Sequence, residues 1–71
     1  MKTYKILHAE GFKDCCFDGL TFPITVQAVK IKSGAMKGWI EVKGDQFIRQ
    51  GGNEWLSGMS FEFSPAAFIE V

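Results

Sequence analysis

The 71-residue chain has only two cysteines, and they are neighbours, Cys15 and Cys16. Adjacent cysteines cannot join distant segments, which excludes a secreted scaffold built on a disulfide framework. The chain also lacks an apolar run near the roughly 20 residues that a membrane-spanning helix requires. Lys2 and Lys5 interrupt the apolar stretch that a signal peptide would need at the N-terminus. We therefore expect a single soluble domain, residues 1–71, in the reducing cytoplasm.

An excess of charge of either sign is also missing, because eight basic residues balance eight acidic ones. The signs are unevenly spread: residues 1–49 carry all eight cations against five acids, whereas residues 50–71 carry three acids and no cation. Four lysines follow one another closely, at Lys30, Lys32, Lys37 and Lys43. Such a strip can attract phosphates, but it is equally typical of a solvated surface. With a net charge of zero, nucleic-acid binding at physiological salt is expected to be weak or absent.

Helical periodicity is nearly absent as well, since no long stretch repeats apolar side chains at the spacing of an amphipathic helix. Apolar and polar residues alternate instead, with glycine-rich segments between the alternating runs. The expected strands lie within residues 3–9, 24–32, 38–50, 59–63 and 68–71, and residues 10–23 form an irregular excursion. These patterns predict an all-β fold in which five or six short antiparallel strands curl into a small barrel or sheet.

Two local features refine this expectation. In residues 24–32 the apolar phase changes between Ala28 and Val29, which predicts a β-bulge or sharp bend that lets both halves of the strand face one core. In residues 38–50 the dipeptide Gly-Asp at 44–45 predicts a hairpin with a two-residue type II′ turn.

Trp39 falls out of phase with Ile40 and Val42, which must face the core, so strand periodicity turns Trp39 outward. The hairpin register pairs Glu41 with Ile48 and thereby places Ile48 on the face of Trp39. An exposed tryptophan with a polar rim is typical of protein-binding surfaces. The candidate partner-binding residues are Trp39, Ile48, Glu41, Lys43, Arg49 and Trp55. Two alternatives stay open: this face could stack on nucleotide bases, or another segment could cover it as a second layer.

The segment DCCFDG, residues 14–19, is the most reactive-looking stretch of the chain. Its cysteines lack the C-x-x-C spacing of redox motifs, and side chains that are adjacent in a strand point in opposite directions and chelate a metal poorly. Asp14 and Asp18 are explained by turn capping, and nothing in the spacing gives His8 a catalytic geometry. We therefore expect no catalytic residue, no metal and no cofactor.

The closing segment FSPAAFIEV, residues 63–71, resembles the end of an SH3 domain, where a proline-led 3₁₀ turn precedes an aromatic residue and a short final strand. The excursion at residues 10–23 stands where SH3 domains carry their long first loop. The resemblance implies a small SH3-like barrel. The opening motif, the acidic first loop and the tandem tryptophans of that family are absent from the chain, so no proline-peptide-binding residues are carried over.

The function expected from these features is that of a non-enzymatic protein-interaction module, which blocks a protein partner by occupying its surface. Small, neutral chains without a reactive site are common among phage and mobile-element accessory proteins that act as inhibitors of host proteins. The partner could also be a second copy of the chain, and no membrane partner is expected. The alternative function is a small-barrel, single-stranded nucleic-acid-binding protein that uses the lysine strip and Trp39.

We expect the purified protein to carry no stoichiometric metal, because two adjacent thiols are a poor chelating pair. Iodoacetamide should block at least one of the thiols without unfolding the domain. Elemental analysis and thermal melting, each with and without a chelator, check this expectation. About one equivalent of zinc, together with melting on chelation, would contradict it.

Overall fold

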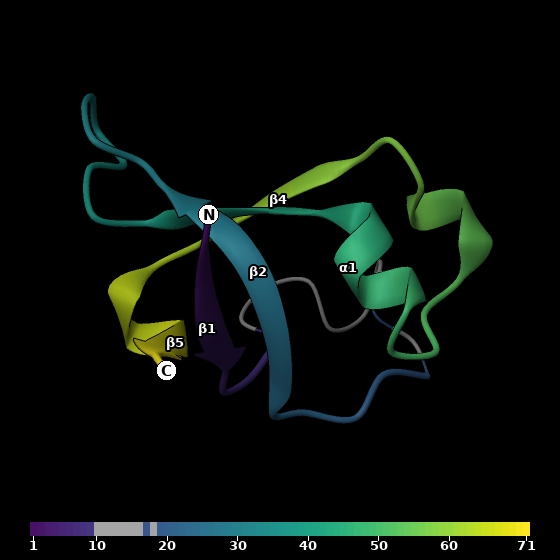
Figure 1. The fold of residues 1–71 in the computed structure, drawn as a ribbon. Helices are drawn as coiled ribbons and strands as arrows, with labels where there is room; N and C mark the ends of the chain where they lie inside the picture. Colours follow the sequence, from purple (N-terminus) through teal and green to yellow (C-terminus); the bar gives the residue numbers. More distant parts are fainter. Residues whose placement is uncertain (10–16, 18) are drawn as a thin grey trace.

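The computed structural model describes residues 1–9, 17 and 19–71. Within these residues five strands form a sheet: β1 (Lys2–Ile6), β2 (Ile24–Lys30), β3 (Ile40–Lys43), β4 (Ser60–Phe63) and β5 (Phe68–Glu70). Three short helical segments accompany them: α1 (Gly44–Ile48), η2 (Glu54–Leu56) and η3 (Pro65–Ala67). The strand order is β4-β3-β2-β1-β5, and neighbouring strands are antiparallel. The expected fold class is confirmed: this is a small all-β fold with a curled sheet (Figure 1). The predictions for the two cysteines and their flanking aspartates lie outside the described residues.

β2 is shared between the two halves of the sheet. Its residues 24–28 pair with β1, and its residues 29–30 pair with β3. A strand that changes partners along its length lets a small sheet curl onto itself. The long curve of β2 in Figure 1 therefore sets the shape of the whole domain.

The prediction that a bulge or sharp bend at Ala28–Val29 lets both halves of β2 face the core is wrong for Val29. Val29 continues the two-residue alternation after the buried Ala28 and is 51% exposed, so the second half of the strand does not return its apolar side chain to the core. A β-bulge lies instead at Gly38 and Trp39, which together oppose Ile31. The Gly38 N–H donates to the Ile31 carbonyl (2.9 Å), and the Ile31 N–H donates to the Trp39 carbonyl (2.8 Å). Gly38 has a φ of 92°, the left-handed conformation that this kind of bulge assigns to glycine.

The predicted hairpin turn at residues 44–45 is also wrong. The chain forms α1 directly after β3, and the antiparallel neighbours of β3 are β2 and β4. A Cβ atom at Gly44 would overlap the backbone carbonyl of Leu56, because η2 packs closely against the start of α1. The glycine is therefore required by this close approach and not by a type II′ turn.

Large aromatic rings fill the core. The buried apolar residues are Tyr4, Ile6, Ala9, Phe17, Ile24, Val26, Ala28, Ile40, Val42, Phe47, Leu56, Phe61, Phe63, Ala67 and Phe68. Phe17 lies between α1 and β4, with its ring centroid 4.5 Å from that of Phe47 and 4.9 Å from that of Phe61. Phe63 completes the cluster, 6.0 Å from Phe47. Ring pairs at these separations are stabilising beyond the apolar area that they bury.

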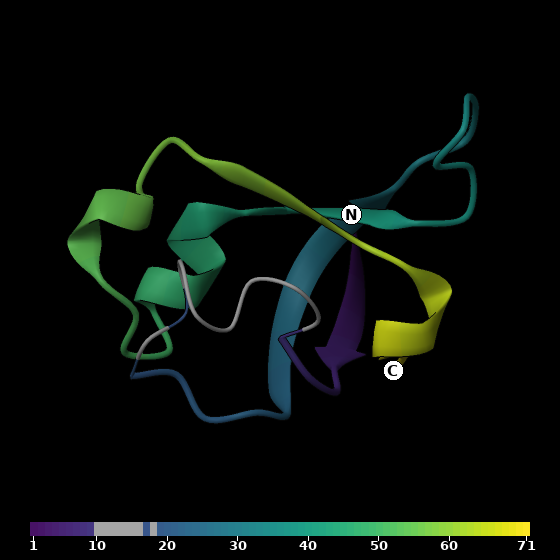
Figure 2. The same cartoon turned by 180° about the vertical axis from the view of Figure 1, so that it is seen from behind.

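The end of the chain follows its prediction. Pro65 begins η3, and the buried Phe68 then pairs with Ile6 of β1. The Leu7 N–H donates to the Ala67 carbonyl (2.7 Å), which fixes η3 beside the end of β1. Met59, the first residue of the expected strand 59–63, precedes β4 and is 36% exposed. Figure 2 shows the same arrangement from behind, with β4 and the η3 segment in the foreground.

Gly44→Ala should destabilise the domain by about 1–3 kcal/mol, because the added methyl group must displace backbone. The midpoint of urea unfolding measures the effect. Asp45→Ala truncates the exposed neighbouring residue and serves as the control, with a change within about 0.5 kcal/mol. An unchanged or raised midpoint for Gly44→Ala would contradict the packing of α1 against η2.

Candidate interaction surface

Strand pairing brings three apolar side chains to the outer face of the β2–β3 hairpin. Ile40 and Val42 are fully buried, so Trp39 and Glu41 point to the opposite face of the sheet. Val29 lies directly opposite Glu41. Side chains of directly opposed residues share one side of the sheet, which places Val29 on this outer face.

The backbone hydrogen bonds continue the same pairing beyond the ends of the strands. The Ile31 N–H donates to the Trp39 carbonyl (2.8 Å), so Ile31 opposes Trp39 as Val29 opposes Glu41. Val29 and Ile31 are two residues apart and share a face. We call Val29, Ile31 and Trp39 the Trp39 patch.

The Trp39 patch is not part of the core. Among the described residues, the partly buried apolar side chains that pack against the core are Leu20, Phe22 and Ile48. Trp39 and Ile31 are partly buried without belonging to that set, and Val29 is half exposed. An apolar row on the outside of a sheet is thus left for contact with something other than the core.

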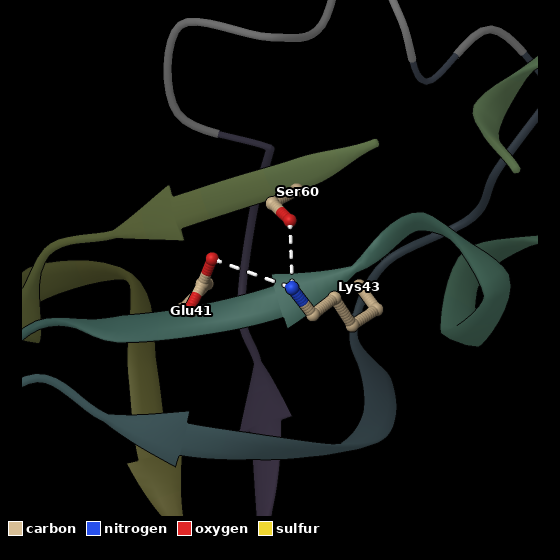
Figure 3. A network of polar contacts seen from close by, with 3 residues as sticks. All are labelled: Glu41, Lys43 and Ser60. Atoms are coloured by element: carbon tan, nitrogen blue, oxygen red, sulfur yellow. Dashed lines mark hydrogen bonds and ion pairs between the residues drawn. The ribbon is translucent and has the colours of Figure 1, made fainter. Parts of the chain in front are cut away.

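Charged side chains border the patch on β3 and β4. Glu41 lies directly opposite Glu62, and both are partly buried. The Lys43 Nζ lies 3.6 Å from the Glu41 Oε2 and donates a hydrogen bond to the Ser60 Oγ at 3.1 Å (Figure 3). Like charges at directly opposed positions are destabilising, and the Lys43 ammonium offsets that repulsion. Exposed ion pairs of this kind contribute up to about 1 kcal/mol.

The candidate residues from the sequence therefore separate into two groups. Trp39, Glu41 and Lys43 share the outer face, as expected. Ile48 does not lie beside Trp39, because residues 44–48 form α1 and Ile48 packs against the core. The expected contact between Trp39 and Ile48 is a consequence of the wrong hairpin register.

Arg49 and Trp55 also lie away from the patch in the fold. Arg49 is the C-cap residue of α1, with its N–H donating to the Asp45 carbonyl (3.3 Å). Trp55 belongs to η2 and is 50% exposed. Figures 1 and 2 both place η2 at the opposite end of the molecule from the loop of residues 33–38.

The sequence reasoning missed Val29 and Ile31 as surface residues. The available signal was the simple alternation through Ala28, which turns Val29 and then Ile31 away from the core. The apolar character of Val29 and Ile31 points the other way, because apolar residues of a strand are usually buried in the core.

Two further searches complete the description. Within residues 1–9, 17 and 19–71, no group of three or more His, Cys, Asp or Glu side chains is placed to hold a metal ion. No helix in the described part of the chain is long and apolar enough to cross a membrane. Comparison with protein-family models, with curated proteins and with solved structures found no match.

The stability of two alanine variants distinguishes a core residue from a surface residue. Ile48→Ala should lower the free energy of unfolding by about 2 kcal/mol, because it removes apolar packing against the core. Trp39→Ala should lower it by less than about 1 kcal/mol, as for other substitutions outside the core. Urea unfolding followed by circular dichroism measures both without relying on tryptophan fluorescence. The reverse order would place Trp39 in the core.

Proposed function

We propose that this chain is a non-enzymatic protein-interaction module and that the Trp39 patch is its partner-binding surface. The single observation that carries the proposal is the row of Val29, Ile31 and Trp39 on the outer face of the β2–β3 hairpin, outside the core. Apolar surface bordered by polar residues is typical of interaction sites. Tryptophan in particular contributes a large share of the binding energy where it anchors an interface.

The charges around the patch support a protein partner over a nucleic acid. Glu41 and Glu62 lie on the same face as Trp39, and both carboxylates would repel phosphates. The charge of Lys43 is directed to Glu41, with which it forms an ion pair. A nucleic-acid-binding surface instead combines aromatic side chains with an uninterrupted basic groove.

The proposed mode of action is occupation of a partner's surface. A small domain can block a larger protein without any chemistry of its own if its apolar patch fits a site that the larger protein needs. An accessory protein that inhibits a host protein, as phages and mobile elements encode, would act in this way. The strand order, the shared strand β2 and the 3₁₀ turn before β5 support a relation to SH3-like small barrels at the level of topology.

Photo-crosslinking tests whether this face meets a partner. Val29 is replaced by p-benzoylphenylalanine, and the protein is irradiated in cells of the organism from which it comes. The matched control carries the same probe in place of Ile69, which is 49% exposed against 51% for Val29 but lies on β5. We expect a discrete crosslinked protein from position 29 that is not recovered from position 69.

With the captured partner in hand, Trp39→Ala should weaken binding by roughly 2 kcal/mol or more, which is about 30-fold in Kd. Trp55→Ala removes the other tryptophan and should change Kd by less than about threefold. Calorimetric titration of the folded variants measures both constants. Equal crosslinking from the two probe positions, or a Trp39→Ala variant that is folded and binds with unchanged Kd, would contradict the proposed surface.

A further inference from the structure

A hollow of about 210 Å³ opens where β1 and β2 run side by side near the start of the chain. Its lining residues are Met1, Lys2, Tyr4, Ala28, Val29, Lys30 and Lys32. Lys2 lies directly opposite Ala28 in the sheet. Tyr4 and Ala28 are buried and give the hollow an apolar floor.

Three lysines from two distant parts of the sequence converge on this hollow. Lys2 belongs to β1, whereas Lys30 and Lys32 come from the end of β2 and the residues after it. Lys2 pairs with Glu70 of β5, with 3.3 Å between the Lys2 Nζ and the Glu70 Oε2. Among the described residues, neither Lys30 nor Lys32 forms an ion pair. The hollow therefore carries an excess of positive charge that no described carboxylate balances.

We propose that this hollow binds a small phosphate-bearing anion. Lysine ammonium groups bind phosphate oxygens as point charges. Lys30 and Lys32, which form no ion pair with a described residue, match the charge of a phosphate dianion. The apolar floor strengthens such an interaction, because charges attract more strongly where water is partly displaced. Val29 lines this hollow and also belongs to the Trp39 patch, so the two sites adjoin. Trp39 and Ile31 do not line the hollow, and its ligand is of a different class from the proposed protein partner.

The size of the hollow decides between a small phosphate and a nucleic acid. Pockets for drug-sized ligands enclose about 300–1,000 Å³, so 210 Å³ suits a phosphate group with a small body. Binding of a single strand instead needs a groove that follows several nucleotides. Lys37 and Lys43 do not line the hollow, so two of the four lysines of the strip take no part in this site.

The test is a titration with inorganic pyrophosphate at a fixed ionic strength of about 0.15 M, followed by amide chemical shifts in two-dimensional NMR. We expect saturable shifts concentrated at residues 2–4 and 28–32. The Lys30→Gln/Lys32→Gln variant should bind pyrophosphate about tenfold more weakly, because it removes two of the three ammonium groups at the hollow. Trp39→Ala should leave the pyrophosphate affinity unchanged, which separates this site from the proposed protein-binding surface.

The matched control is Lys37→Gln/Lys43→Gln, which removes the same number of charges elsewhere and should change the affinity by less than about threefold. Equal losses in the two double variants, or shifts spread over all lysines, would show diffuse charge attraction and overturn the proposal. A second arm replaces pyrophosphate by a single-stranded oligonucleotide of about ten nucleotides. Tighter binding of the oligonucleotide, lost in both double variants, would overturn the small-anion site in favour of a nucleic-acid surface.

Discussion

The packing of phenylalanine rings against the inner face of the curled sheet is the interaction on which the rest of the structure depends. A chain of this length buries only about 60% of its unfolded surface, so a few large side chains must supply most of the apolar contact. Phe61 and Phe63 come from β4, and Phe47 and Phe17 cover them from α1 and from the segment before β2. Residues 44–48 form the helix α1 after β3, and this helix packs Phe47 against the phenylalanine rings of β4.

The residues that lie on the outer face of the sheet follow from the inward position of α1. Once α1 turns inward, it cannot lie beside β3 as a strand, and β4 takes the neighbouring position. Ile48 is then used in the core, and the outer side of β3 keeps Trp39 beside Val29 and Ile31 from the partner strand. Nothing in this account requires Trp39 for folding, which is why its patch is assigned to binding.

The two proposed sites differ in chemistry although β2 contributes to both. Val29 belongs to an apolar row bordered by Glu41 and Glu62, whereas Lys30 lies at a hollow with two further lysines. The net charge of zero conceals this separation of acidic and basic surface. A protein partner and a small anion could therefore bind the same domain through different groups.

Local patterns predicted the parts of the fold that depend on neighbouring residues. Alternation in residues 24–32 and 59–63 identified the strands β2 and β4, and the proline-led turn before Phe68 identified the last one. The outward direction of Trp39 followed from Ile40 and Val42 in the same way.

The remaining features depend on contacts between distant segments. A five-residue helix is too short to show helical periodicity, and the Gly-Asp signal at 44–45 favours a turn unless the approach of Leu56 is known. The residues that lie beside Trp39 depend on the strand register. An error in one predicted turn changes every residue pair of that hairpin. The convergence of Lys2 with Lys30 becomes visible only when β1 is paired with β2.

Trp39 shares an outer face with Ile31, whereas Ile48 packs against the core. The most direct measurement is the set of nuclear Overhauser effects from the Trp39 indole protons in the isolated domain. We expect cross-peaks to the Ile31 side chain, and cross-peaks from the Ile48 methyl groups to core side chains instead of to the indole. Strong cross-peaks between Trp39 and Ile48 would contradict the account, because they would restore the hairpin register and remove the proposed binding surface.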